Sequence, residues 1–328
     1  MESFLFAVNA VLPIILTVAV GYFLKKIGFI TEALAKGMNK LVFHVFLPVM
    51  LFLNLYNMED FGAMDMRYVL YSVAALVAIF LLAIPTVILL EKHNARRGVL
   101  LQASFRSNYA LIGIPLAQSL FGEDGALIAT VLSAAVIPVF NALAVVSLTV
   151  FRADGGKPSI KKILLGIVKN PLIQSIAVGL AVLGVRAAFV HTGVAFRLSD
   201  ITPLMTVLKY LSDMATPLAL LVLGAQFEFS AVATLRREIV FGTLMRTVVV
   251  PLLGLGTAYL FFRDMFGGAH FAAFVAMFAT PVAVSTVPMA QEMDADTELA
   301  GQLVVWTTLV SAFSVFFISY ILKVVGVF

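Results

Sequence analysis

Ten long apolar segments follow one another along this 328-residue chain, and they restrict it to a membrane. A helix needs about 20 mostly apolar residues to cross the hydrocarbon core of a bilayer. The segments that qualify are residues 4–24, 39–57, 67–90, 98–121, 125–151, 170–190, 203–227, 238–262, 270–291 and 300–326. Because hydrophobic residues make up 62% of the chain and charged residues only 12%, the composition excludes a soluble fold. We therefore predict an all-α integral membrane protein with ten transmembrane helices.

The basic residues divide unequally between the two sides that ten spans would define. Fourteen of the 22 Lys and Arg residues lie in or beside the loops after the first, third, fifth and seventh segments, and five lie on the opposite side. Cytoplasmic loops are enriched in Lys and Arg, so we expect both termini outside the cytoplasm of a plasma membrane, the inner membrane of a bacterium. One loop is an exception, because it is acidic where the rule places it in the cytoplasm. Its acidic residues are Glu292, Asp294, Asp296 and Glu298.

A short proline motif occurs in both the fourth and the ninth segment. The string Ile-Pro-Leu-Ala-Gln over residues 114–118 resembles Val-Pro-Met-Ala-Gln over residues 287–291. A proline inside a membrane helix frees a backbone carbonyl and usually breaks the helix. Freed backbone is tolerated in lipid only where protein buries it or where it lines a cavity. Paired breaks in corresponding places of two halves therefore point to the binding site of a transporter.

The similarity between the two halves extends beyond these strings. Two further pairs of segments match in the same order, with their prolines in register. They are Pro13–Gly21 with Pro171–Gly179, and Lys40–Pro48 with Lys209–Pro217. Each half then holds five helices, and an odd number requires the second half to enter the membrane from the opposite side. We predict two inverted five-helix repeats, residues 1–151 and 170–328, joined by a cytoplasmic connection over 152–169.

Inverted symmetry would bring the broken helices 4 and 9 together near the middle of the bilayer. Their half-helix N-termini would offer free N–H groups and a partial positive charge, which suit an anion. The residues expected to form this crossing are Gly113, Pro115, Pro281 and Pro288. The residues expected to bind a substrate there are Asn108, Tyr109, Asn141, Thr280, Ser285, Arg106 and Asn54.

Each of these features also has a structural interpretation. The prolines could merely kink packed helices, and Asn54 and Asn141 could make hydrogen bonds between helices. Arg106 could supply a countercharge to a carboxylate or could cap carbonyls freed at the break. Arg246, within the eighth segment, could extend its side chain to the cytoplasmic surface.

Several absences narrow the function. The chain has no cysteine, which excludes disulfides, thiol catalysis and Cys-ligated metal. No acidic residue lies at either break, and the only acid well inside a segment is Asp213, which argues against a cation as the transported species. No nucleotide-binding, hydrolase or metalloprotease motif occurs, so we expect neither an enzyme nor a cofactor or metal site. The basic residues lie in short loops, so a nucleic-acid partner is not expected.

The string Asn-Tyr-Ala-Leu-Ile-Gly-Ile-Pro over residues 108–115 resembles the Asn-x-x-x-x-Gly-x-Pro signature of the auxin efflux carrier family, which includes plant PIN proteins and bacterial relatives. The resemblance covers the whole chain and includes residues 21–22, 39–40 and 224–229. It implies a fold like that of bile-acid symporters and sodium/proton antiporters. Helices 1, 2, 6 and 7 would form a scaffold domain that also mediates homodimerisation. Helices 3–5 and 8–10 would form a transport domain that moves as an elevator.

The resemblance further implies a secondary transporter of small organic anions, either auxin-like monocarboxylates or dicarboxylates such as malate or malonate. Thr280 stands where plant members place an Asn, so the two crossings are not expected to contribute equally. Coupling stays open between uniport and proton symport. The alternatives are a sodium-coupled symporter of the bile-acid type and, in another class, a non-transporting membrane sensor that only binds a ligand. Apart from its substrate, membrane lipid is the expected partner.

Overall fold

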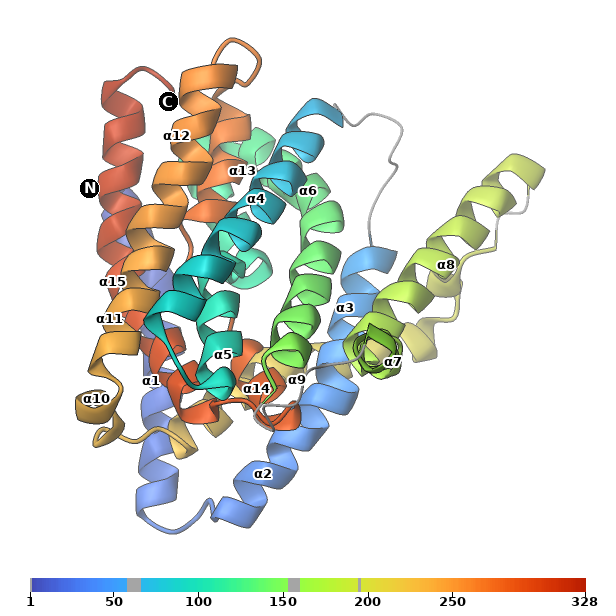
Figure 1. Cartoon of the computed structure of the whole chain (residues 1–328). Coiled ribbons are helices and arrows are strands. Elements are labelled where there is room, and N and C mark those ends of the chain that lie inside the picture. The colour runs from blue at the N-terminus through green and yellow to red at the C-terminus, as the bar shows by residue number, and fades with distance from the viewer. Residues whose placement is uncertain (1, 58–65, 153–159, 194–195) are drawn as a thin grey trace.

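The computed structural model describes residues 2–57, 66–152, 160–193 and 196–328, and in these ranges every regular element is a helix (Figure 1). The helices of the first half are α1 (Glu2–Lys26), α2 (Glu32–Leu41), α3 (Leu47–Tyr56), α4 (Met66–Leu90), α5 (Asn94–Phe105) and α6 (Ile114–Val150). Those of the second half are α7 (Ile160–Lys169), α8 (Pro171–Thr192), α9 (Thr202–Ala225), α10 (Ala231–Thr234), α11 (Arg236–Leu244), α12 (Val250–Phe262), α13 (Gly268–Phe278), α14 (Thr286–Glu292) and α15 (Thr297–Val324). Helices thus cover most of each predicted segment.

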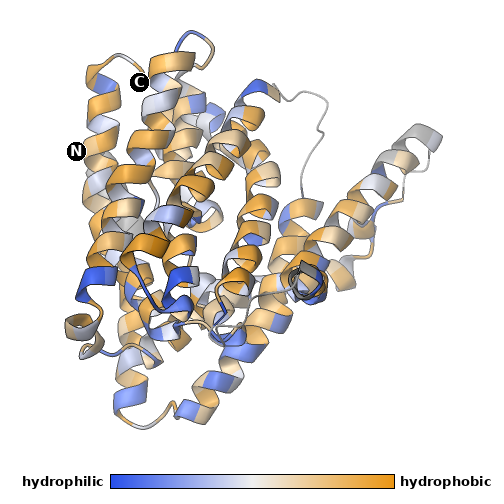
Figure 2. Cartoon of the chain, viewed as in Figure 1, coloured by the Kyte–Doolittle hydropathy of each residue, from blue (hydrophilic) through white to orange (hydrophobic). Residues whose placement is uncertain are grey.

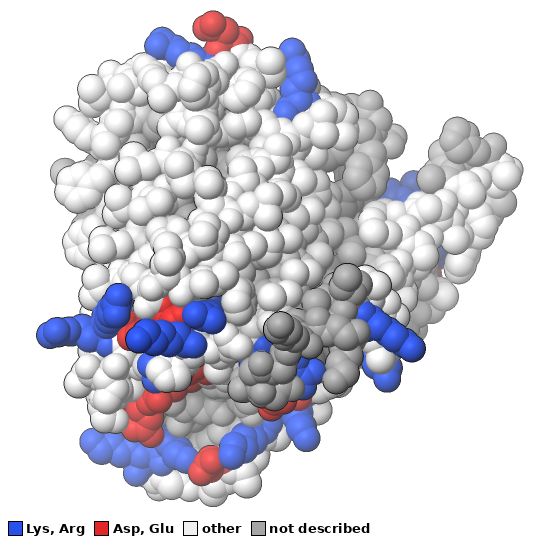
Figure 3. Space-filling model, viewed as in Figure 1, with Lys and Arg blue, Asp and Glu red and all other residues white. Residues whose placement is uncertain are grey.

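Six helical stretches among the described residues are long and apolar enough to cross a membrane. They are Glu32–Tyr56, Met66–Leu90, Tyr109–Val150, Thr202–Ala225, Arg236–Phe262 and Thr297–Val324. Hydrophobic residues dominate the middle of the helices (Figure 2), and on the face drawn in Figure 3 the charged side chains gather toward the two ends. This distribution is the one that a bilayer imposes, and the chain is an integral membrane protein.

The longest of these stretches contains a reversal of the chain. Phe121 and Gly122 have non-helical backbone angles, and Gly122 has the positive φ (60°) that favours glycine. A Cβ atom on Gly125 would clash with the backbone oxygen of Ala117, although residues eight apart in a straight helix are separated by about 12 Å. The chain therefore turns back at Gly122, at the boundary predicted between the fourth and fifth segments, and α6 comprises two helices.

Three helices widen into a π-helical turn directly ahead of a proline. The turns are Val42–Phe46 before Pro48, Tyr109–Gly113 before Pro115 and Met245–Val249 before Pro251. A proline ring clashes with the carbonyl four residues earlier and cannot donate to it. A π turn adds one residue to the hydrogen-bonded ring and so relieves this conflict without ending the helix.

The centre of the molecule lies around α13. All eight residues from Phe271 to Phe278 are at most 1% exposed, and the helix packs against α6. A helix that is apolar on every side must be surrounded by protein or lipid, and here protein surrounds it. This explains why an 11-residue helix can lie deep in the structure.

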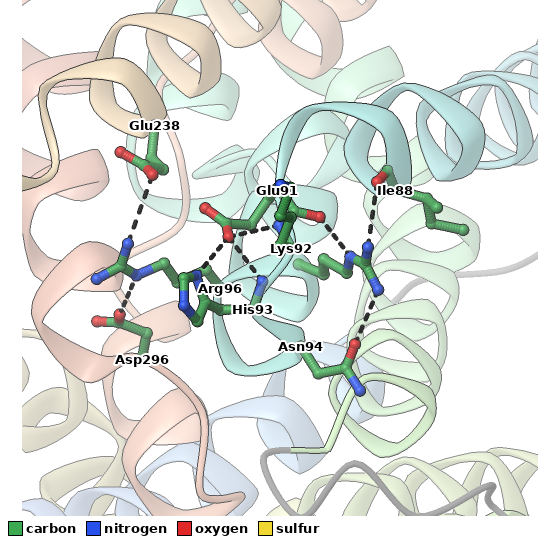
Figure 4. Close-up of polar contacts among 9 residues, drawn as sticks. Ile88, Glu91, Lys92, His93, Asn94, Arg96, Glu238 and Asp296 are labelled. Carbon is green, nitrogen blue, oxygen red and sulfur yellow. Dashed lines mark hydrogen bonds and ion pairs between the residues drawn. The ribbon is translucent and has the colours of Figure 1, made fainter.

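A polar network connects the first turns of α5 and α11 with the loop before α15 (Figure 4). Arg96 donates from Nε to Asp296 Oδ2 at 3.0 Å, and its Nη1 lies 3.5 Å from Glu238 Oε1. Asp296 also caps the N-terminus of α15 by accepting from the Leu299 N–H at 2.8 Å. The acidic loop between α14 and α15 thus lies beside the basic loop between α4 and α5, on the face where the sequence rule places both.

The contribution of Glu91, in the same network, to the stability of the fold should depend on pH. Burial raises the pKa of its carboxyl group, but hydrogen bonds from His93 and Lys92 outweigh this effect, so the pKa lies below its usual value. A carboxyl with a depressed pKa stabilises the fold above its unfolded pKa of about 4.3, and this stability is lost as pH falls through the folded pKa. Glu91→Gln should lower the unfolding temperature at pH 7, and the difference should shrink in strong acid. The exposed Glu298→Gln is the control, and an equal loss at every pH would contradict the explanation.

Helices α1 and α9 approach so closely that only glycine fits between them. A Cβ atom on Gly21 would clash with the backbone oxygen of Leu221, and one on Gly224 would clash with that of Val18. Small residues permit such close contact between membrane helices.

We therefore expect Gly224→Ala to destabilise the protein by about 1–3 kcal/mol, because neither backbone can yield without moving a helix. Gly256, inside α12, has open space around the position of a Cβ atom, so Gly256→Ala should be neutral or stabilising. The unfolding temperatures of both variants in detergent check this. Equal behaviour of the two variants would refute the close-contact argument.

Candidate substrate site at the crossing of two broken helices

The first helix break lies between α5 and α6. Helix α5 ends at Phe105, Arg106 has extended backbone angles (φ −85°, ψ 112°), and the helical conformation resumes at Tyr109. The second break is longer, because α13 ends at Phe278 and α14 begins only at Thr286. Helices 4 and 9 are therefore both broken, as the paired motif predicts.

The prolines of the motif lie just after the breaks rather than within them. Pro288 is the third residue of α14, and the first turn of a helix tolerates proline because its missing N–H would have no intrahelical partner there. Pro115 directly follows the π turn Tyr109–Gly113, whose additional residue accommodates it. Of the three prolines and one glycine expected at the crossing, only Pro281 lies inside a break, while Gly113 packs against Ala276 of α13.

The two breaks contact each other directly. The Asn108 N–H donates to the Pro281 carbonyl at 2.8 Å, and Ser107 pairs with Val282 in an isolated antiparallel bridge. The Val282 N–H donates to the Thr307 hydroxyl of α15 at 3.1 Å. Extended backbone from one break thus satisfies backbone of the other, which is how irregular chain is accommodated inside a membrane protein.

Arg246 caps the carbonyls that the breaks release. Its guanidinium donates to the carbonyls of Thr280 at 2.7 Å, Phe105 at 3.2 Å and Met277 at 2.8 Å. The side chain is fully buried. The expectation that Arg246 reaches the cytoplasmic surface is therefore wrong, because three unpaired carbonyls at the ends of α5 and α13 bind it inside the fold.

Arg106 lies at the first break and is also buried, but its partners are neutral. It donates from Nη2 to Asn141 Oδ1 at 2.7 Å and from Nη1 to Gln102 Oε1 at 3.0 Å, and Nη1 lies 2.7 Å from Met289 Sδ. No acidic side chain among the described residues forms an ion pair with it. Arg106 does not cap the freed carbonyls, since Arg246 does so.

Three buried polar atoms on residues that adjoin Arg106 in the chain or contact it have no hydrogen-bond partner among the described residues. They are Asn108 Nδ2, Ser107 Oγ and Gln102 Nε2. A buried polar group without a partner costs about 1–3 kcal/mol, so a cluster of such groups beside an unpaired cation calls for a ligand or water.

Two cavities meet at the crossing. The larger, of about 750 Å³, is lined by α1, α3 and α9 on one side and by the two breaks on the other. The smaller, of about 70 Å³, lies between the first break, α3 and α6. Asn54, Asn108 and Ser285 line both cavities, so the two spaces adjoin.

The structure brings together six of the seven residues predicted to bind a substrate. Asn54, Asn108 and Ser285 line the larger cavity, and Arg106, Tyr109 and Asn141 line the smaller one. The Tyr109 hydroxyl already donates to the Ala129 carbonyl at 2.9 Å. Thr280 lies apart from both cavities, because its hydroxyl donates to the Ala276 carbonyl at 2.8 Å and it is fully buried.

Sequence analysis missed most of the wall opposite the crossing. Thr17 of α1 and Ser212, Asp213 and Thr216 of α9 line the larger cavity. The sequence feature that could have indicated them is their position near Pro13 and Pro217, since each of these prolines has a matching proline in the other half of the chain. Gln102 and Met289, which contact Arg106, carry no comparable signal, because their role depends on where the chain folds.

Apolar helices with two broken segments that cross beside a cavity with a few polar groups are typical of a membrane transporter. The family model described as membrane transport protein matches residues 6–156 and 157–319. The chain belongs to this family, which is the auxin efflux carrier family, and the resemblance predicted from its Asn-Gly-Pro signature is confirmed.

The relatives have the same general description. A protein of Methanothermobacter thermautotrophicus named as an uncharacterized transporter is 26% identical over 317 residues, covering 95% of this chain and 97% of that protein. The uncharacterized transporter YfdV of Escherichia coli is 28% identical over 261 residues, covering 75% of this chain and 76% of YfdV. These similarities support a membrane transporter.

Arg246→Met should destabilise the protein by more than about 3 kcal/mol, because it leaves three buried carbonyls without donors at about 1–3 kcal/mol each. Arg246→Lys should lie between this variant and the wild type, since an ammonium group cannot reproduce the planar arrangement of donors. The unfolding temperature in detergent is the measurement, with the exposed Arg263→Met as control. A stable Arg246→Met protein would show that the crossing does not depend on this cap.

Proposed function

We propose that this protein is a secondary transporter of small organic anions, built from two inverted five-helix repeats. The observation that carries the proposal is the buried guanidinium of Arg106 at the first break, which has no acidic partner among the described residues. An unpaired cation inside a membrane protein is costly, and a bound anion would balance it. Asn108, two residues away, has a free Nδ2 donor and is one of the residues that line the cavity that would admit the anion.

The N-terminus after the first break adds further donors. The Asn108 carbonyl accepts from the N–H groups of Ile112 and Gly113, so the N–H groups of Tyr109 to Leu111 precede the first intrahelical bonds. Ala110 and Leu111 also line the larger cavity. We infer that a carboxylate would bind here, between the helix N-terminus, Asn108 and Arg106.

The second break offers less to an anion. The N–H groups of Thr286 and Val287 donate to the carbonyls of Ala283 and Val284, and Pro288 has no N–H. Its contribution to the site would be the Ser285 hydroxyl. This asymmetry supports the prediction that the two crossings contribute unequally, with Asn108 as the main polar contact.

The walls of the larger cavity favour a substrate with an apolar body. Most of the residues between its polar ends are aliphatic or proline, including Ile14, Leu47, Leu220 and Val284. An auxin-like monocarboxylate satisfies both parts of such a cavity, and a short dicarboxylate such as malonate would leave the apolar wall unfilled.

We further propose an elevator mechanism. Helices α1, α3 and α9 belong to the helices that would form the scaffold domain, and the two breaks belong to the transport domain. The larger cavity lies between the two sets, where a displacement of one against the other would change the side to which the cavity opens. The Gln226 side chain bonds Gln291 across the same boundary at 2.9 Å.

Uptake of radiolabelled indole-3-acetate and malonate into proteoliposomes tests the site. Asn108→Ala and Arg106→Gln should each reduce uptake at low substrate concentration by about 10–100-fold, because a hydrogen bond to a charged group contributes about 1.5–3 kcal/mol. The controls are Asn57→Ala and Arg263→Gln, which are exposed and do not line either cavity.

A thermal unfolding series against mono- and dicarboxylates complements the uptake assay, since a bound ligand raises the unfolding temperature by mass action. Wild-type uptake with unchanged uptake by well-folded Asn108→Ala and Arg106→Gln would overturn the assignment of the site. Binding without any uptake would overturn the transport function itself.

A further inference from the structure

A single acidic residue lies on the wall that faces the crossing. Asp213 is near the middle of α9 (Thr202–Ala225), and it lines the same cavity of about 750 Å³ as Asn108 and Ser285. Its side chain is exposed and has no ion-pair or hydrogen-bond partner among the described residues. An ionisable group this far inside a membrane span is costly, and such groups generally have a function.

No other titratable side chain among the described residues lines this cavity. Lys209 lies one turn earlier on α9, at a spacing that places the two side chains on the same face of the helix, but the described residues include no ion pair between it and Asp213. The other charged or titratable residues whose side chains are described on α9 and on the elements packed against it do not line the cavity: Tyr22, Lys25 and Lys26 on α1, Glu32, Lys36 and Lys40 on α2, His44 on the π turn, Tyr56 on α3, Asp200 before α9, Tyr210 on α9 and Glu292 on α14. An ionised Asp213 would therefore share the cavity with the substrate while no positive side chain lines it.

The main chain at Asp213 lacks one helical hydrogen bond. Pro217, one turn later in α9, also lines the cavity and cannot donate the N–H that the Asp213 carbonyl would normally accept.

We propose that Asp213 is the proton-binding residue that couples anion transport to a proton gradient. The inference rests on the proposed anion transport. An anion in the cavity and an ionised Asp213 repel each other, and no positive side chain lines the cavity to offset this repulsion. A proton that enters with the anion and binds Asp213 removes the repulsion, so we expect an anion and a proton to bind together.

The position of Asp213 on the proposed scaffold suits such coupling. A residue fixed near the middle of the membrane faces whichever side the cavity opens to, so it can take a proton from one side and release it to the other. For a monocarboxylate the transported pair carries no net charge, so uptake would not depend on membrane potential.

The test uses proteoliposomes that hold the full-length protein, labelled indole-3-acetate and malonate, and a pH-sensitive dye inside. Wild-type uptake should rise up to about tenfold for each unit by which the external pH is lowered, because proton concentration then rises tenfold. It should acidify the interior. Asp213→Asn mimics the protonated acid, so it should still transport but lose the pH-gradient dependence and become sensitive to membrane potential. Asp213→Glu should retain coupling, and the exposed Asp200→Asn is the charge-matched control.

The outcomes separate the two proposals. Absence of uptake of both anions by the wild type would count against the proposed transport function. With wild-type uptake present, three results would overturn the role of Asp213: persistent proton coupling in Asp213→Asn, complete loss of transport in that variant despite normal unfolding temperature, or a requirement for a sodium gradient in place of protons.

Discussion

The three hydrogen bonds from the Arg246 guanidinium to backbone carbonyls hold the crossing in place. Breaking a helix inside a membrane releases carbonyls that water cannot reach, and each must find a donor within the protein. Arg246 donates to carbonyls of both broken helices, to that of Phe105 on one and to those of Met277 and Thr280 on the other. One side chain thus links the ends of α5 and α13, and the position of every cavity-lining residue on the two breaks depends on it.

The two buried arginines near the crossing have different partners. The Arg246 guanidinium donates to backbone carbonyls, whereas Arg106 contacts only neutral side chains, so its positive charge is not balanced beside the cavity. The two breaks differ in the same way. After the second break the first N–H groups of the helix donate to carbonyls in tight turns, whereas after the first break they make no intrahelical hydrogen bond. The proposed inverted repeat would therefore combine two similar helix breaks with different chemistry, as the proposed substrate with one charged end requires.

Hydropathy and the repeated motif predict the helical segments, the two broken helices and their contact, because these depend on composition and on spacing along the chain. Hydrogen-bond partners are less predictable. The partners of Arg246 lie 31, 34 and 141 residues away, so nothing nearby in the sequence indicates its role. Thr280 was expected at the site from its place beside Pro281, but its hydroxyl turns back to its own helix, as Thr commonly does. The wall opposite the crossing was missed because cavity lining depends on how α1 and α9 pack.

The π-helical turns ahead of Pro48, Pro115 and Pro251 also alter which way side chains point. Each residue rotates an α-helix by about 100°, and a π turn inserts one additional residue. An apolar or polar stripe that is followed through such a turn therefore changes phase by nearly a third of a revolution. A cysteine scan of these helices that assumes one continuous period would assign cavity-facing positions to the lipid side, and the segments before and after each turn must be phased separately.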